Sequence, residues 1–127
     1  MEFRETKGIY LQIVDQVRER IVQGDWSAGE RIPSIREMAV EVGVNPNTVA
    51  RSYQALVDRQ LIANQRGRGY FVSEDAVARA VTEMKEEFLR EEVPKIVRTM
   101  WLLGIGPEEI AARLSCDKQN NPEGSSP

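Results

Sequence analysis

Apolar residues in the first half of the chain recur every three or four positions, which is the spacing of one face of an α-helix. A first run ends at Gly24 and a second at Gly43, and glycine is the residue that most often terminates a helix. Residues 34–37, Ser-Ile-Arg-Glu, open the second run as a capping box, in which serine and glutamate each accept a hydrogen bond from the other's backbone amide. Asn45 is a good N-cap and Pro46 suits the first helical position, so a third helix follows at once. The pattern predicts three helices, the last two joined by a short turn that contains Gly43.

Two short apolar runs after the third helix predict a β-hairpin. Residues 61–65 and 70–72 have the character of strands, and residues 66–69, Arg-Gly-Arg-Gly, connect them. Glycine permits the positive φ angles that a tight hairpin needs. Two helices joined by a short turn with a glycine form a helix-turn-helix, and a hairpin directly after it is the wing of a winged helix. The predicted fold class is mainly α with a small β-hairpin, with a winged helix-turn-helix over residues 1–72.

Helical spacing returns after residue 72 and predicts two or three C-terminal helices. A first apolar stripe fails at residues 91–92, both glutamates, and Pro94 removes a backbone donor, so we expect a kink or a break there. Gly104 ends a second stripe, and Pro107 suits the start of a last short helix.

The two C-terminal stripes carry more apolar surface than two isolated helices can hide. We therefore expect residues 73–115 to form a helical dimerisation segment, and the polar residues 116–127 to form a disordered tail. The alternative is that these helices fold back on the winged helix of their own chain. The residues expected to make the dimer contact are Val77, Val81, Met84, Phe88, Ile96, Met100, Trp101 and Leu103.

Composition excludes several classes of function. The chain has no histidine, which removes Ser-His and Cys-His nucleophile pairs and histidine-ligated metals, so we predict no enzyme, no catalytic residue, no metal and no cofactor. The single cysteine, Cys116, cannot form an internal disulfide, which favours a reducing cytoplasm. No run approaches the roughly 18 apolar residues of a membrane span. Tyr10 and Trp26 are interpreted as core residues rather than as stacking platforms for single-stranded nucleic acid.

The net charge of −3 is unevenly distributed along the chain. Residues 31–72 hold six arginines and three acidic residues, whereas residues 73–127 hold seven basic and eleven acidic residues. Phosphates respond to the local field within about a Debye length, ~8–10 Å, so a basic segment with an acidic appendage favours nucleic-acid binding. A chance fluctuation of surface charge would explain the distribution as well.

The polar face of the third helix supports a contact with DNA. Asn45, Asn47, Thr48 and Arg51 are all hydrogen-bonding residues in its first turns, with no acid among them. In the major groove arginine recognises guanine, asparagine recognises adenine and threonine recognises either, and the N-terminal part of a recognition helix makes these contacts. The alternative is that these residues cap the helix and cover a solvated surface.

Long runs of this sequence resemble the DNA-binding domain of the GntR-type bacterial transcription regulators. These runs are Gly29–Ala39, Gly43–Tyr53, Leu61–Ile62 and Gly67–Val72, and the resemblance extends over about residues 9–72. It implies a regulator that binds its operator as a dimer. By position it also implies DNA contacts at Arg36, Asn45, Asn47, Thr48, Arg51 and Gly67, to which we add Arg66 and Arg68 for their charge.

Only 55 residues follow Val72, and about 40 residues before the tail are too few to enclose a small molecule. This shortness resembles the YtrA subfamily, in which two helices after the wing serve dimerisation and which is often associated with genes for ABC transporters. The resemblance implies a repressor that binds an inverted repeat in double-stranded DNA and controls transporter genes. The sequence identifies no small-molecule effector. The alternative function is a winged-helix docking module without DNA binding.

Overall fold

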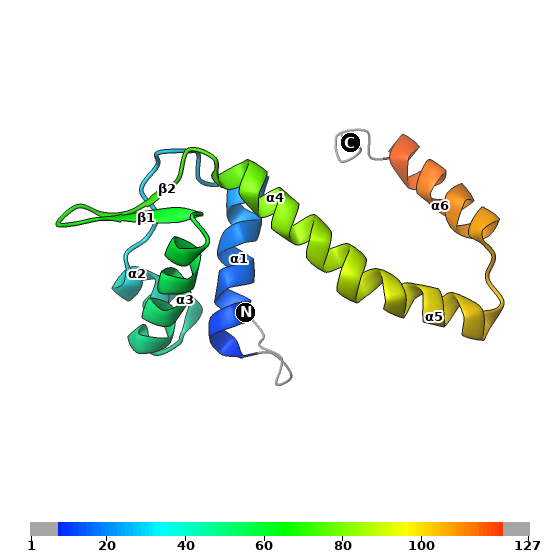
Figure 1. Ribbon diagram of the computed structural model, residues 1–127, viewed down its shortest axis with the longest axis horizontal. Helices are drawn as coiled ribbons and strands as arrows, with labels where there is room; N and C mark the ends of the chain where they lie inside the picture. The colour runs from blue at the N-terminus through cyan, green and yellow to red at the C-terminus, as the bar shows by residue number, and fades with distance from the viewer. Residues whose placement is uncertain (1–7, 121–127) are drawn as a thin grey trace. The chain divides into compact units, whose positions relative to one another are not determined.

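Helices dominate the structure of this protein, a computed structural model that describes residues 8–120. Along the chain in that range, three N-terminal helices are followed by a two-stranded sheet and then by the C-terminal helices (Figure 1). The elements are α1 (Ile9–Gln23), α2 (Ile35–Val42), α3 (Pro46–Asp58), β1 (Ile62–Gln65), β2 (Gly69–Val72), α4 (Ala76–Glu87), a π-helical turn (Phe88–Glu92), α5 (Val93–Leu103) and α6 (Pro107–Asn120). The predicted fold class, mainly α with a small hairpin in a winged helix-turn-helix, is confirmed.

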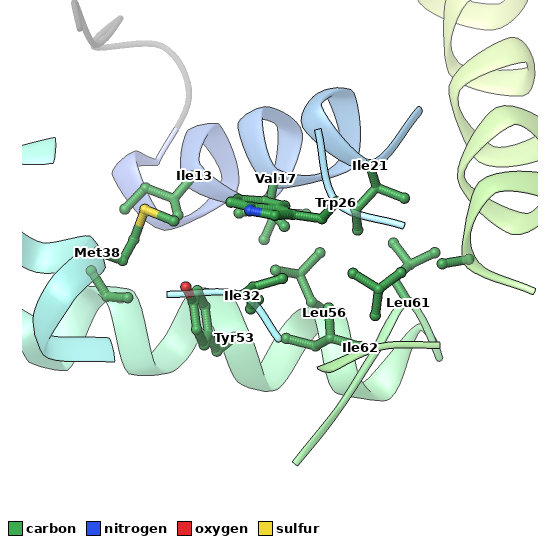
Figure 2. Packing of buried hydrophobic residues seen from close by; sticks show 14 of the residues in the cluster. Ile13, Val17, Ile21, Trp26, Ile32, Met38, Tyr53, Leu56, Leu61 and Ile62 are labelled. Atoms are coloured by element: carbon green, nitrogen blue, oxygen red, sulfur yellow. The ribbon is translucent and has the colours of Figure 1, made fainter. Parts of the chain in front are cut away.

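The core of the winged helix lies between α1 and α3. Ile13, Val17 and Ile21 of α1 face Tyr53 and Leu56 of α3 (Figure 2), and none of the five is more than 1% exposed. The remaining large side chains come from the segment between α1 and α2, from α2 and from the start of the hairpin: Trp26, Ile32, Met38, Leu61 and Ile62. Residues three or four apart share one face of a helix, so the sequence pattern accounts for this packing.

Caps define both ends of α2. The Glu37 backbone N–H donates to Ser34 Oγ at 3.1 Å, and the Ser34 N–H donates to Glu37 Oε1 at 2.8 Å. The bond from the Ser34 amide is the main reason why the pKa of the Glu37 carboxyl lies below its ordinary value. At the other end Gly43 has a φ of 70°, and its N–H donates to the Ala39 carbonyl. The predicted capping box and glycine stop are both confirmed.

The wing is a hairpin in which β1 and β2 run antiparallel. Ile62 lies opposite Val72 at its base, and Gln65 lies opposite Gly69 near its tip. The strands begin and end within one residue of the predicted bounds. Figure 1 shows the hairpin projecting to the left past α2 and α3, and residues 66–68, Arg-Gly-Arg, connect its two strands.

Tyr53 joins the recognition helix to the wing. Its hydroxyl donates to the Pro33 carbonyl at 2.7 Å, and its ring meets the edge of Tyr70 on β2 with centroids 4.9 Å apart and an angle of 77°. The Ile32 N–H donates in turn to the Tyr70 carbonyl at 2.9 Å. Burial raises the pKa of Tyr53, so the hydroxyl stays protonated and remains a donor. These contacts set the position of the wing relative to α3.

The compact N-terminal unit extends further than the predicted boundary at Val72. Ala76 and Ala80 of α4 have no exposed surface and belong to the core cluster, and the unit extends to Lys85. The first part of α4 therefore packs on the winged helix of its own chain. The pattern of large apolar residues did not reveal this contact, because two alanines four residues apart make it.

Ion pairs strengthen the contact between α4 and α1. Arg18 on α1 is only 3% exposed, and its guanidinium donates to the carboxylates of Glu83 on α4 at 2.9 Å and of Asp15 at 2.7 Å. A second cation, Arg59 at the end of α3, has its Nη1 atom 3.7 Å from the same Glu83 oxygen.

The predicted kink or break near Pro94 takes the form of one π-helical turn. The Val93 N–H donates to the Phe88 carbonyl five residues earlier, and helical backbone continues on both sides. Pro94 lies in the first turn of α5, where the missing N–H needs no helical partner. The change of hydrogen-bond pattern therefore accommodates the proline without ending the helical run.

The last described helix extends into the segment expected to be a disordered tail. α6 continues to Asn120, so residues 116–120 are helical. This departs from the predicted boundary, and the reason is local: no glycine or proline interrupts the sequence before Pro122. The rest of the predicted tail, residues 121–127, lies outside the described residues.

Candidate nucleic-acid interface

The polar face of α3 lies opposite its buried face. At about 100° per residue, Asn47 and Arg51 are about 40° apart around the helix, whereas Leu56 lies about 180° from Asn47. Asn47 and Arg51 are exposed, Thr48 is half-buried and Leu56 has no exposed surface. The packing on α1 therefore turns the polar first turns of α3 outward, as a recognition helix requires.

The two asparagines at the start of α3 have different roles. Asn45 is the N-cap, and its Oδ1 accepts a hydrogen bond from the Asn47 backbone N–H at 2.8 Å. The capping interpretation of Asn45 is therefore confirmed. Bidentate recognition of adenine needs both the oxygen and the nitrogen of an amide. Asn47, whose side chain is exposed and outside the cap, is the better placed of the two for that contact.

Arg51 extends from α3 toward the first turn of α1. Its guanidinium carbon lies 3.7 Å from the centroid of the Tyr10 ring. Tyr10 is only half-buried, so it differs from the buried core residue that we expected, whereas Trp26 is 7% exposed and does belong to the core. The role of Tyr10 beside Arg51 gave no signal in the sequence, because the two residues are 41 positions apart.

Arg36 and the wing arginines are exposed at separate places on the winged helix. Arg36 lies in the first turn of α2, and Arg66 and Arg68 flank Gly67 at the tip of the hairpin. Gly67 has a φ of 75°, which confirms the need for glycine in that turn. The Arg68 N–H donates to the Gln65 carbonyl at 2.8 Å and closes the turn. The structure therefore leaves both wing side chains at the surface.

A further arginine, Arg31, lies beside β2. Gly69 has a φ of 119°, and a Cβ added there would lie 2.9 Å from Arg31 Nε. The backbone of Arg31 also pairs with Phe71 of β2 as an isolated antiparallel bridge, so this residue lies against the wing. The sequence includes Arg31 in the basic segment but does not predict its place beside the wing, because the pairing of Arg31 with Phe71 forms only when the chain folds.

The residues predicted to make a dimer contact divide into two groups. Met84 is partly buried and packs against the core cluster of its own winged helix, and Val81 and Met100 are half-buried. The other five are exposed: Val77, Phe88, Ile96, Trp101 and Leu103. No residue of α5 is buried. Further exposed apolar residues in the C-terminal helical segment are Leu89, Val97, Leu102 and Leu114.

Other kinds of site find no support in the described part of the chain. Residues 8–120 contain no group of three or more histidine, cysteine, aspartate or glutamate residues placed to hold a metal ion. Among the helices of that range, none has the length and apolar character needed to cross a membrane.

The sequence pattern of the bacterial regulatory proteins of the gntR family matches residues 9–72, which run from the start of α1 to the end of the wing. The chain belongs to the gntR family. The matched residues include α2, α3 and the hairpin, so all the candidate contact residues lie within the part of the chain that matches the family.

Members of the gntR family are similar to this chain over most of its length. The uncharacterised HTH-type transcriptional regulator YhcF of Bacillus subtilis is 38% identical over 109 residues, which cover 86% of this chain and 88% of that protein. The HTH-type transcriptional repressor YtrA of the same bacterium is 32% identical over 125 residues, covering 93% and 95%. A solved GntR family transcriptional regulator from Listeria monocytogenes has a TM-score of 0.71 and 33% identity, covering 89% and 97%.

This membership decides between the two functions that the sequence left open. The chain is a DNA-binding transcriptional regulator with a winged helix-turn-helix, and it is not an enzyme. The predicted resemblance to the GntR family and to its YtrA-like members is confirmed. The docking-module alternative is set aside.

Proposed function

We propose that this gntR-family regulator represses transcription by binding an inverted repeat in double-stranded DNA as a homodimer. The observation that carries the proposal is the outward-facing polar start of α3, held on a buried core beside a wing with arginines at its tip. Such a surface fits one half-site of an operator.

On the recognition helix, we assign base contacts to the exposed residues of the first turns. Arg51 suits guanine and Asn47 suits adenine, since both present several hydrogen-bonding atoms to a base edge. Thr48 is half-buried, so less of its side chain is available to a base. Arg36 and Asn45 flank this surface and suit the phosphates on either side.

On the wing, we assign contacts to the backbone or the minor groove. Arg66 and Arg68 are exposed at the tip, and Gly67 between them has no side chain to prevent a close approach. Arginine is well suited to a narrow minor groove, where the negative potential is enhanced. These contacts would add affinity on most sequences, because phosphates carry no sequence information.

The dimer is supported by the apolar surface of the C-terminal helices. Trp101 is 84% exposed and Leu102 is 79% exposed, and no residue of α5 is buried. A standard interface of about 800 Å² per partner, at about 25 cal/mol per Å², represents a gross gain on the order of 40 kcal/mol, most of which is offset by the costs of association. A two-fold dimer then places two recognition helices on two half-sites, which is why the operator should be an inverted repeat.

The regulated genes and the direction of regulation are inferred from relatives. YtrA of Bacillus subtilis is named a repressor, and this chain is similar to it over 93% of its length. The resemblance to the YtrA-like group also favours transporter genes as targets. We place the protein in the cytoplasm, with the chromosome.

Selection of bound fragments from the source genome, followed by titration of the best duplex, tests the proposal. We expect the selected fragments to share an inverted repeat near promoters of transporter genes, and the protein to be a dimer by light scattering at micromolar concentration. Selected sites without two-fold symmetry would contradict the inverted repeat. A full-length protein that stays monomeric would contradict the dimer.

The matched control is a duplex with one half-site scrambled. If two copies bind together, this duplex should lose most of the affinity of the intact site, because the second contact is no longer made at high effective concentration. A duplex of random sequence measures the non-specific background, and the titration is repeated at two salt concentrations.

A further inference from the structure

Tyr10 and Arg51 form a contact that the sequence did not predict. The Arg51 guanidinium carbon lies 3.7 Å from the centroid of the Tyr10 ring, which is a stacking distance. Arg51 is exposed and Tyr10 is half-buried, so the ring supports the arginine at the surface of the winged helix. A guanidinium that stacks by its face keeps the N–H donors at its edge available for a partner.

The backbone around this pair is fixed by a buried serine. Ser52, the residue after Arg51, has no exposed surface, and its Oγ donates to the Tyr10 carbonyl at 2.8 Å and lies 3.1 Å from the Thr48 carbonyl. The hydroxyl therefore ties the first turn of α1 to the same turn of α3 that carries Arg51. The position of the Tyr10 ring relative to Arg51 depends on this packing and not on a loop.

We propose that Tyr10 is a positioning residue for DNA readout, which holds the Arg51 guanidinium in place before DNA binds. The inference rests on the proposed contact between Arg51 and DNA. A free arginine side chain has many rotamers, and ordering it on binding costs affinity. A ring that already restricts the side chain removes part of that cost, which is the general effect of pre-organisation.

The wing arginines provide a contrast within the same molecule. Arg68 lies 5.9 Å from the centroid of the Phe71 ring, at the limit of such a contact, whereas Arg51 lies 3.7 Å from the Tyr10 ring. Bidentate recognition of a base needs a fixed guanidinium plane, while a phosphate contact tolerates a mobile one. Of these two candidate DNA contacts, the arginine that stacks closely is Arg51, for which the geometry of the contact matters more.

A double-mutant cycle in the full-length protein tests this inference. The variants are Tyr10→Leu, Arg51→Ala and the two together, with Tyr10→Phe as the matched control that keeps the ring. Each is titrated with the duplex selected from the genome and with a random duplex of equal length. We expect Tyr10→Leu to weaken binding to the selected duplex about three- to fivefold, to leave binding to the random duplex unchanged, and to cause no further loss when Arg51 is already alanine. Tyr10→Phe should bind like the unsubstituted protein.

Other outcomes distinguish a failure of the inference about Tyr10 from a failure of the proposed function. An equal loss from Tyr10→Leu with and without Arg51 would overturn the inference, because Tyr10 would then act independently of the arginine. A loss in Tyr10→Phe as large as in Tyr10→Leu would overturn it as well. If the unsubstituted protein binds both duplexes equally, the proposed sequence-specific function itself fails, and the inference fails with it.

A measurement on the unsubstituted protein without DNA does not depend on the folding of any variant. The Nε–H order parameter of Arg51, measured by NMR relaxation without DNA, should exceed that of Arg66 at the wing tip. In a folded Tyr10→Leu protein, confirmed by circular dichroism, the value for Arg51 should fall while that for Arg66 stays the same. Equal disorder of the two arginines in the unsubstituted protein would overturn the inference.

Discussion

The winged helix and the C-terminal helices dispose of their apolar residues in opposite ways. In α1 and α3 most of the apolar stripe is buried, and Ile13 and Leu56 have no exposed surface. In α5 no residue is buried, and Trp101 is 84% exposed. Both stripes follow the same helical spacing. The comparison teaches that spacing identifies an apolar face, but that only the neighbouring elements determine whether the chain itself covers that face.

The helix α4 has both buried and exposed apolar residues. Ala76 and Ala80 are buried in the core of the winged helix, and Met84 packs against the same cluster. Val77 on the same helix and Phe88, the first residue of the π-helical turn that follows it, are about half exposed. One helix therefore contributes to the internal core through its small residues and offers larger residues for association.

The largest effect on stability is expected in the core of the winged helix. Leu56→Ala should lower the free energy of unfolding by about 2–5 kcal/mol, because Leu56 has no exposed surface and its removal leaves a cavity. Denaturant titration measures this change. The control is Val40→Ala, at an 85% exposed position of α2, which should change stability by no more than about 0.5 kcal/mol. Similar losses at the two positions would mean that the core is not where the structure places it.

The second prediction concerns association through α5. Trp101→Glu should convert the dimer to a monomer by light scattering and weaken binding to the selected duplex about 100-fold, because the two half-sites are then bound independently. The thermal unfolding of the winged helix should change little, since Trp101 contributes nothing to that core. Arg98→Glu, which introduces glutamate at a charged position of the same helix, is the matched control. A dimer that survives Trp101→Glu would exclude this face from the interface.

The third prediction separates base recognition from phosphate contact within the winged helix. Arg51→Ala should cost about 1–3 kcal/mol on the selected duplex and relax the preference at one or two base pairs. Arg68→Ala should weaken all duplexes more evenly and flatten the salt dependence, because one phosphate contact is lost. Titrations at two salt concentrations distinguish these outcomes. If Arg51→Ala weakens selected and random duplexes equally, Arg51 holds only phosphate.

The smallest effect is expected at the capping box of α2. Ser34→Ala should cost about 0.5–2 kcal/mol of stability, measured by denaturant titration at neutral pH. The pKa of Glu37, followed by NMR titration, should rise toward its ordinary value, because the Ser34 hydroxyl is one of the groups that lower it. If Ser34→Ala lowered the stability but left the pKa of Glu37 unchanged, the hydrogen bonds of the Ser34 side chain would not be what lowers that pKa.

The pH dependence of the cap has a definite sign. The folded state lowers the pKa of Glu37 below 4.5, so the charged carboxylate stabilises the fold above that pH. As the pH falls through the lowered pKa, Glu37 is protonated in both states and its contribution is lost. Glu37→Gln keeps an acceptor for the Ser34 amide without the charge, so the difference between Glu37 and this variant should disappear in acid.

Local chemistry was sufficient to predict the helix-turn-helix and the wing. Ser34 and Asn45 cap the helices, Gly43 ends α2 and Gly67 forms the hairpin turn, as their residue types indicated. The same local reasoning identified the exposed polar start of α3. These features depend on residues within four positions of one another, so the sequence contains all the information that they need.

Contacts between distant segments were beyond that reasoning. The stacking of Arg51 on Tyr10, the course of Arg31 across Gly69 and the burial of Ala76 each depend on elements that approach only after folding. Large apolar residues predicted the core correctly because burying them yields the most free energy. Small residues and arginines carry no comparable signal, since an alanine or an arginine is compatible with the surface and with a contact alike. Only the packing of α1, α3, α4 and the wing on one another decided which of these residues make such contacts.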